Sequence, residues 1–200
     1  MCKFLFAGGG TSSDAVLCLD YLRANGVVIT NNSWGGGGYT LALLEAIRRV
    51  CTAGGLFVAA AGNEGVNIAG GSFPAAYVKY SGAGCVLPVA ATGSSNTLAS
   101  FSNWGTDVPI AAPGVNIRSS VYDRKVKNRE ATWSGTSMAA PHVTGVALFI
   151  KNALPALNGT MIKKAFVESA TVGIKPYGTN MISGKLLDAE AAYELAATMM

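Results

Sequence analysis

The chain contains 200 residues, of which half are hydrophobic, 13% are charged and 25 are glycine, and its formal net charge is +4 at pH 7. This length suits a single domain, residues 1–200, with a sizeable core, and the composition excludes a disordered chain. The one dense basic segment, 124–129 (RKVKNR), lacks interleaved aromatic side chains, so we interpret it as a solvated loop and expect no nucleic-acid partner. No apolar run reaches the roughly 18 residues that cross a bilayer, so no transmembrane segment is predicted.

The N-terminal residues 1–8 (MCKFLFAG) hold one charge and a short apolar stretch, which is too short for a secretory signal peptide. The cysteines are Cys2, Cys18, Cys51 and Cys85. They do not show the CxxC or Cys/His spacing of a structural zinc site, and no metal site is predicted. Cys18 and Cys51 occupy apolar positions in helical patterns, so buried free thiols are favoured over disulfides. The redox compartment and the localisation stay open.

Strand and helix patterns alternate along the chain. We expect helices at 12–25, 40–52, 136–152, 159–170 and 188–198, and strands at 27–30, 56–61, 85–92 and 108–112. In the first helix, Ser12 or Ser13 is the expected N-cap and Gly26 is the expected stop. Glycine-rich loops follow the carboxyl ends of the strands. This pattern predicts a doubly wound α/β fold, with a mostly parallel sheet flanked by helices and with ligands bound outside those strand ends.

Two segments carry candidate chemistry. Residues 135–142 (GTSMAAPH) place one serine, Ser137, between a glycine-bearing turn and an apolar helix. The free N–H groups and the macrodipole at the start of a helix favour an oxyanion beside that hydroxyl. Asn63 ends a buried strand in 59–65 (AAAGNEG), where its carboxamide can donate to a charge that forms at the mouth of the sheet. Taken singly, each segment has a plain structural alternative: a small-residue helix start and a turn asparagine.

Together these segments resemble the nucleophile and oxyanion motifs of the subtilisin-like serine proteases, the subtilase family of the peptidase S8 type. Residues 33–36 (SWGG) resemble the family's substrate-binding strand, and 72–77 (SFPAAY) resemble the segment beside its primary specificity pocket. Residues 184–189 (GKLLDA) resemble the closing segment of its domain. The resemblance runs from about residue 3 to about residue 195. It implies a subtilisin-like fold, serine endopeptidase activity and a polypeptide substrate.

The resemblance also implies roles for single residues. Ser137 is the implied catalytic nucleophile, and Asn63 is the side chain that completes the oxyanion hole with the backbone N–H of Ser137. The implied substrate-binding residues, which pair with or lie beside an extended peptide, are Ser33, Trp34, Gly35, Ala61, Gly62 and Ser72. A cis peptide bond is implied between Phe73 and Pro74. Many members bind a structural calcium ion with an aspartate at the position of Gly93, so that site is doubtful here and no cofactor is certain.

The sequence offers no recognisable base for the serine. A serine nucleophile needs a base to take its proton and a carboxylate to orient that base. The single histidine, His142, follows Ser137 by five positions on the same helix, which is about 500° of turn, so it points away and is expected to be structural. Asp14 and Asp20 lie outside any segment that resembles the family's aspartate and histidine motifs.

We therefore interpret residues 1–200 as the C-terminal two-thirds of a peptidase domain, without the N-terminal part that holds the catalytic Asp and His. The absent strands would lie beside the 27–33 strand, and their absence leaves that edge of the sheet open. The chain by itself is expected to be inactive. The alternative is a degenerate, non-catalytic protease domain that binds extended peptides through 33–35. An α/β-hydrolase esterase is disfavoured because Ser137 lacks the GxSxG motif.

Overall fold

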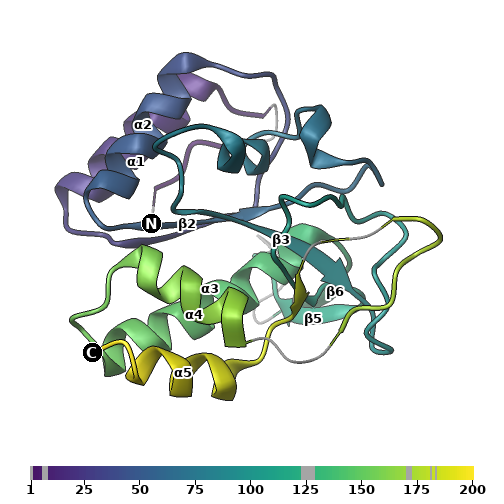
Figure 1. Cartoon of the computed structure of the whole chain (residues 1–200). Helices are drawn as coiled ribbons and strands as arrows, with labels where there is room; N and C mark the ends of the chain where they lie inside the picture. Colours follow the sequence, from purple (N-terminus) through teal and green to yellow (C-terminus); the bar gives the residue numbers. More distant parts are fainter. Residues whose placement is uncertain (1, 6–8, 123–128, 170–172, 181, 183) are drawn as a thin grey trace.

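The structure is a computed structural model that describes residues 2–5, 9–122, 129–169, 173–180, 182 and 184–200. Figure 1 shows a central sheet with helices above and below it. The sheet is parallel, has the strand order β1-β2-β3-β4-β7, and consists of β1 (Ile29–Asn32), β2 (Leu56–Ala60), β3 (Val86–Thr92), β4 (Ile110–Pro113) and β7 (Lys185–Leu186). The predicted doubly wound α/β fold is confirmed.

The helices form the two outer layers. One layer holds α1 (Ser12–Ala24) and α2 (Leu41–Thr52), and the other holds α3 (Thr136–Ala153), α4 (Gly159–Ser169) and α5 (Ala189–Ala197). Two 3-10 helices, η1 (Ile68–Gly70) and η2 (Ala75–Lys79), precede β3. None of the helices in the described ranges is long and apolar enough to cross a membrane.

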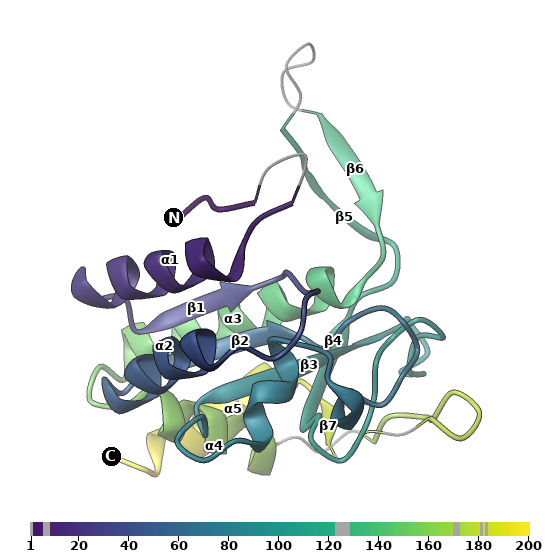
Figure 2. The same ribbon diagram turned by 90° about the horizontal axis from the view of Figure 1, so that it is seen from above.

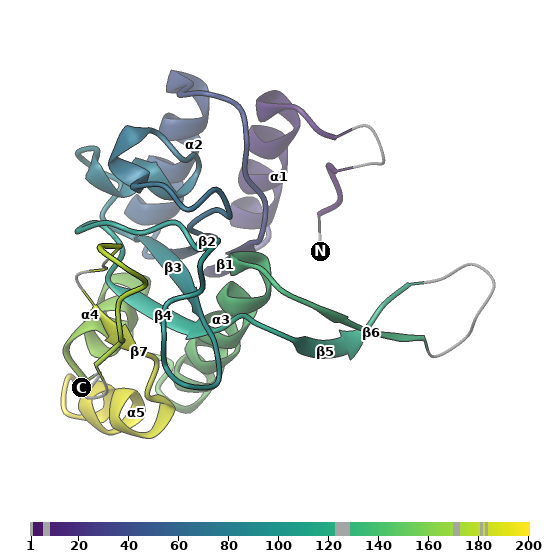
Figure 3. The ribbon, with the colours of Figure 1, turned by 90° about the vertical axis from the view of Figure 1, so that its right-hand side faces the viewer.

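A separate antiparallel pair of strands lies outside the main sheet. It consists of β5 (Ile117–Ser120) and β6 (Glu130–Trp133), which project away from the body of the molecule in Figures 2 and 3. Sequence analysis missed this pair because nearly all of its side chains are exposed, so no buried stripe marks it. Residues 124–128 of the predicted solvated loop at 124–129 lie outside the described residues.

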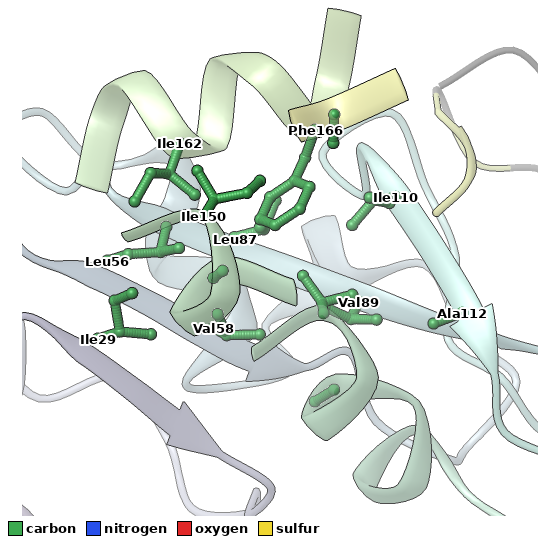
Figure 4. Close-up of a cluster of buried hydrophobic side chains, with 14 of the residues drawn as sticks. Ile29, Leu56, Val58, Leu87, Val89, Ile110, Ala112, Ile150, Ile162 and Phe166 are labelled. Atoms are coloured by element: carbon green, nitrogen blue, oxygen red, sulfur yellow. The ribbon is translucent and has the colours of Figure 1, made fainter. Parts of the chain in front are cut away.

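Side chains that alternate along the strands form a large core on each face of the sheet, and a smaller third cluster includes Ile68, Leu98 and Val108. Figure 4 shows the core under α3 and α4, which includes Ile29, Leu56, Val58, Leu87, Val89, Ile110, Ile150, Ile162 and Phe166. The other core packs Phe57 and Tyr77 against the buried sides of α1 and α2. Because both faces are covered, the inner strands are continuous apolar runs, which made them recognisable in the sequence.

The first strand begins two residues later than predicted. The 27–30 prediction followed β-branched residues, whereas β1 ends with Asn31 and Asn32, whose pairing with β2 is set by the sheet. Asn32 is buried, and its side-chain amide is satisfied by the carbonyl of Val58, to which it donates at 3.2 Å. Tertiary hydrogen bonds therefore override the low strand propensity of asparagine.

The N-cap of α1 is also displaced by one residue. Thr11, rather than Ser12 or Ser13, caps the helix, and its hydroxyl oxygen accepts a hydrogen bond from the N–H of Asp14 at 3.1 Å. The Thr11 hydroxyl also donates to the Asp14 carboxylate at 2.7 Å. Three consecutive hydroxyl residues offer equal capping chemistry, so local sequence alone did not separate them.

All four cysteines are paired, so the prediction of free thiols is wrong. Cys2 pairs with Cys18, and Cys51 pairs with Cys85, with Cα–Cα distances of 5.6 and 5.2 Å. The helical pattern places Cys18 and Cys51 on inward faces of α1 and α2 as expected. The partner of each cysteine depends on which segment the fold packs against that face, and this was not visible in the spacing. Disulfides of this kind persist in oxidising environments.

We expect the Cys51–Cys85 disulfide to stabilise the domain. Replacing both residues by alanine should lower the free energy of unfolding by about 3–4 kcal/mol, because the bond closes a loop with a sequence separation of 34. The measurement is the urea midpoint of the variant and of the unaltered protein, each with and without a reducing agent. If the variant and the unaltered protein had equal urea midpoints without the reducing agent, this expectation would be contradicted.

Lys163 provides a second test of the fold. Its side chain lies largely buried on α4, where Nζ donates to the carbonyls of Gly84 and Val86 at 2.8 and 2.7 Å. Burial lowers the pKa of Lys163 from 10.5 to about 8. Between these two pH values the unfolded chain holds a proton that the folded chain has lost.

The free energy of unfolding should therefore rise with pH across this window, by at most about 1.4 kcal/mol per pH unit from this group. The Lys163→Met variant should lack that part of the rise. Urea titrations of both proteins at several pH values give the difference between their free energies of unfolding. The contributions of all other titrating groups cancel in this difference. Parallel pH profiles for the two proteins would rule out this role for Lys163.

Candidate active site

Ser137 is the second residue of α3, at the end of the helix that faces the carboxyl edge of the sheet. The turn before it is held by Gly135, whose N–H donates to the carbonyl of Gly114 after β4 at 2.8 Å. Thr136 is fully buried, and its hydroxyl oxygen accepts a hydrogen bond from the N–H of Gly62 at 3.1 Å. The loop after β2 and the start of α3 are thus joined directly.

Asn63 supplies the cap of α3 from a distant segment. Its carboxamide oxygen accepts hydrogen bonds from the N–H of Thr136 at 2.8 Å and from the Thr136 hydroxyl at 3.0 Å. Among the described residues, both hydrogen bonds of Asn63 use its oxygen, and the residue is exposed, so its Nδ2 group is available as a donor. Asn63 therefore lies against the first residue of α3, next in the chain to Ser137, where the positive end of the helix dipole lies.

Ser33, at the end of β1, lies against Ser137. The Ser33 hydroxyl donates to the carbonyl of Ser137 at 2.9 Å, and the Ser137 hydroxyl donates to the carbonyl of Ser33 at 3.3 Å. Asn31 extends this contact, because its amide donates to the Ser33 hydroxyl and its oxygen accepts from the Thr144 hydroxyl on α3. The edge strand and the first turns of α3 are therefore held together beside the candidate nucleophile.

Within the part of the chain that the structure describes, no histidine or carboxylate bonds to the Ser137 hydroxyl. The exposed His142 ring lies with Nδ1 2.9 Å from the carbonyl of Met138, one turn back on the same helix. The Asp14 carboxylate accepts a hydrogen bond from the hydroxyl of Thr11, the N-cap of α1. Asp20 pairs with Arg49 through two hydrogen bonds of 2.9 and 2.7 Å, and this guanidinium lowers the pKa of Asp20. These three side chains are engaged elsewhere, as the sequence analysis expected.

The predicted substrate-binding residues lie on both sides of this site. Trp34 packs edge-on against Phe4 at 5.2 Å between ring centroids, and its indole N–H donates to Asn32. Gly35 follows it as exposed backbone, and the next residue donates its N–H to the carbonyl of Phe73 at 3.3 Å. The Phe73–Pro74 peptide bond is cis, which confirms that prediction.

Sequence reasoning missed Asn103, which organises the other side. This fully buried residue donates its side-chain amide to the carbonyl of Ala61, to the Glu64 carboxylate and to the Ser72 hydroxyl. Its oxygen accepts from the N–H groups of Glu64 and Val66. Gly62, with φ of 109°, passes so close to Asn103 that an added Cβ would lie 2.2 Å from its amide nitrogen. Residues 99–105 (ASFSNWG), which include Asn103, resemble a stretch of the subtilisin-like family, but the sequence indicated no role for this side chain.

The doubtful calcium site has no carboxylate where the family resemblance placed one. Gly93 follows β3 and begins a turn, 93–97 (GSSNT), in which its N–H donates to the carbonyl of Thr97 and its carbonyl accepts from the N–H of Asn96. Ca²⁺ prefers several oxygen ligands with carboxylate charge. The residues of this turn do not fit such an ion. No group of three or more His, Cys, Asp or Glu side chains that could hold a metal occurs among the described residues.

One hollow borders Ser137, and a second lies beside Ser33 and Trp34. One, of about 400 Å³, lies between the β5–β6 pair and the start of α3, and it is lined by Trp133, Ser137, Met138 and His142 among others. The other, of about 580 Å³, lies between residues 2–5 and the free edge of β1, and reaches Ser33 and Trp34. The site is therefore an open cleft at the carboxyl edge of the sheet.

Comparisons with known proteins agree with this geometry. The family model described as the subtilase family, Peptidase_S8, matches residues 3–189. The chain belongs to the subtilase family. It is 34% identical over 187 residues to Alkaline elastase YaB of Bacillus sp. (strain YaB), covering 93% of this chain and 45% of that protein. It is 34% identical over 187 residues to Subtilisin Savinase of Lederbergia lenta, covering 93% of this chain and 64% of that protein.

A solved structure of a cold adapted subtilisin-like serine proteinase superimposes with a TM-score of 0.76 at 32% identity. The superposition covers 91% of this chain and 64% of that one. This subtilase chain thus spans about half to two-thirds of the length of the relatives that it matches. The family and the fold are shared, while part of the relatives' domain has no counterpart in these residues.

Proposed function

We propose that this chain supplies the nucleophile and the oxyanion site of a subtilisin-like serine endopeptidase. The observation that supports the proposal is the junction of Asn63 with the first turn of α3, at Thr136, the residue before Ser137. In this role the Ser137 oxygen attacks the carbonyl carbon of a peptide bond. The N–H of Ser137 and Nδ2 of Asn63 then stabilise the negative oxygen that forms.

The substrate is an extended polypeptide that pairs with the backbone of residues 33–35. Gly35 is exposed, and the absence of a side chain there lets a peptide backbone approach the chain closely. Trp34 would lie against a large apolar side chain upstream of the cleaved bond. Ala61, Gly62 and Ser72 form the opposite side, where Asn103 holds the backbone in place.

The base and its orienting carboxylate come from a segment outside these 200 residues. The carbonyl of Ser33, which the Ser137 hydroxyl now contacts, orients that hydroxyl but is far too weak a base to take its proton. We therefore propose that residues 1–200 form a partial peptidase domain and are inactive by themselves.

The second candidate is a degenerate domain that binds extended peptides without cutting them. It is favoured by the lack of a base beside Ser137 in the described residues. The two candidates differ in what happens when the family's missing part is restored, because only the first then gains a reactive serine.

Residues 1–200 should show no covalent labelling of Ser137 by an organophosphate. A chimera in which the unmatched part of Subtilisin Savinase is placed ahead of residue 1 should be labelled at Ser137 and should hydrolyse a peptide substrate. The reason is that a full triad contributes about 10⁶ in turnover in subtilisin, the reference case, while binding and oxyanion terms leave about 10³–10⁴ over water.

Labelling is read by mass spectrometry on samples whose folding is checked by circular dichroism, with the Ser137→Ala chimera as the control. Ordinary protease activity of the folded 200-residue chain would refute the need for an added base. A folded chimera that binds peptide but is never labelled would support the degenerate domain.

Within the active chimera, Asn63→Asp should lower kcat by about 10²–10³-fold, the range for loss of one oxyanion donor, for which subtilisin is again the reference case. Aspartate keeps the oxygen that caps α3 but has no N–H to donate. The Asn63→Ala variant removes both functions, so it should lose stability as well as activity. An unchanged kcat in the Asp variant, with KM also unchanged, would exclude an oxyanion role for Asn63.

A further inference from the structure

The chain contains two Asn-x-Ser/Thr tripeptides, which is the acceptor sequence for N-linked glycosylation. They are residues 31–33 (NNS), where β1 ends, and residues 158–160 (NGT), where α4 begins. A glycan is bulky and has to project into solvent. The place of each tripeptide in the fold therefore decides which of them can carry one.

The tripeptide at 158–160 is accessible. Asn158 and Thr160 are exposed, and Gly159 between them is buried. The side-chain oxygen of Asn158 accepts a hydrogen bond from the N–H of Met161 at 3.0 Å, as the oxygen of an N-cap residue does. Within the described part of the chain, Nδ2 of Asn158 has no hydrogen-bond partner. The nitrogen that would carry a sugar is thus on an exposed side chain whose oxygen is already held in place.

The fold explains two of the three residues in this tripeptide. Asn158 caps α4, as just described. Gly159 donates its N–H to the carbonyl of Gly54 at 2.7 Å, and a Cβ added there would lie 2.2 Å from the carbonyl oxygen of Gly55. Thr160 makes no side-chain hydrogen bond to any described residue, and threonine is a poorer helix former than alanine. The Thr160 hydroxyl, which the fold does not use, is the group that the acceptor sequence requires.

The tripeptide at 31–33 is engaged in tertiary contacts. The Asn31 amide donates to the Ser33 hydroxyl at 2.9 Å, and the Asn31 oxygen accepts from the Thr144 hydroxyl at 3.1 Å. The Ser33 hydroxyl in turn donates to the carbonyl of Ser137. A sugar on Asn31 would have to fit between β1 and α3. These contacts account for the tripeptide, and we expect no glycan there in the folded protein.

The cysteine pairing is an independent observation on the compartment. Cys2 pairs with Cys18 and Cys51 pairs with Cys85, so all four cysteines of the chain are oxidised. Disulfides form and persist in oxidising environments, among them the lumen of the endoplasmic reticulum. N-linked glycans are added in that same lumen. A chain that acquires its disulfides there is also exposed to the transferase that recognises residues 158–160.

We propose that Asn158 is an N-linked glycosylation site. The donor is an oligosaccharide attached to a lipid through a diphosphate. A bond forms between Nδ2 of Asn158 and C1 of the terminal sugar, and the bond between C1 and the phosphate oxygen breaks. The lipid diphosphate leaves with that electron pair, and one proton passes from Nδ2 to a base of the transferase. The amide oxygen is unchanged, so the modified side chain still accepts from Met161 and caps α4.

A glycan at Asn158 would leave the candidate active site open. Asn158 follows the C-terminal end of α3, whereas Ser137 is at its N-terminal end. The helix has 18 residues and is therefore about 27 Å long. In Figure 1 the loop between α3 and α4 lies on the left, and the β5–β6 pair beside the start of α3 lies on the right. The site of modification is thus distinct from the proposed peptidase site and does not depend on that function.

The test expresses residues 1–200 behind a cleavable secretory leader in cultured animal cells. Peptide-N-glycosidase removes N-linked glycans and converts each glycosylated asparagine into aspartate. The digestion is carried out in heavy-oxygen water, because asparagine before glycine also converts to aspartate spontaneously and only the enzymatic product carries the label. Peptide mapping by mass spectrometry should find labelled aspartate at position 158 and asparagine at position 31 of the secreted protein.

The variant Thr160→Ala keeps Asn158 and Gly159 but removes the hydroxyl of the acceptor sequence, so the mass lost on glycosidase treatment should disappear. The matched control is Thr160→Ser, which keeps the hydroxyl and should keep the glycan. Position 160 is exposed, so neither substitution removes a packed side chain. The glycan is transferred before folding is complete, so the chain retained in the cells is mapped as well as the secreted chain.

An unlabelled position 158 in both the secreted and the retained chain would overturn the proposal. A glycan found at position 31 alone would also overturn it. The same holds for a glycan that remains on position 158 in Thr160→Ala, because its attachment would then not depend on the acceptor sequence.

Discussion

The hydrogen bonds between Asn63 and Thr136 are the junction on which the candidate site depends. A helix begins with N–H groups that have no partner within the helix. Here the first of them is satisfied by a side chain from the loop after β2, 73 residues away in the sequence. The same two bonds that cap α3 orient the Asn63 carboxamide and place it beside Ser137. Stability of the helix start and geometry of the site are therefore inseparable.

Buried polar side chains hold the two loops around this junction. Asn103 is fully buried, yet both its amide and its oxygen have partners, so its burial carries no penalty from unpaired polar atoms. On the other side, Asn31 and Ser33 connect β1 to α3 by side-chain hydrogen bonds. The loops that would bind substrate are thus fixed by hydrogen bonds to the scaffold.

The start of α3 joins three strand ends beside Ser137. Gly135 bonds to Gly114 after β4, and Thr136 bonds to Gly62 after β2. Ser137 bonds to Ser33 at the end of β1. Within the described residues none of these contacts supplies a base, so the packing that positions Ser137 leaves its hydroxyl on the carbonyl of Ser33.

Local patterns in the sequence determined the alternation of strands and helices, the place of Ser137 at a helix start and of Asn63 after a strand, and the lack of a base at His142. These features depend on residues that are near one another in the chain, and motif and periodicity describe such neighbours well. The partners of the cysteines, the role of Asn103 and the β5–β6 pair were decided only by the tertiary structure. Each depends on which distant segments the fold brings into contact, such as Cys51 with Cys85 across 34 positions. The spacing of residues along the chain does not show which distant segments will be in contact.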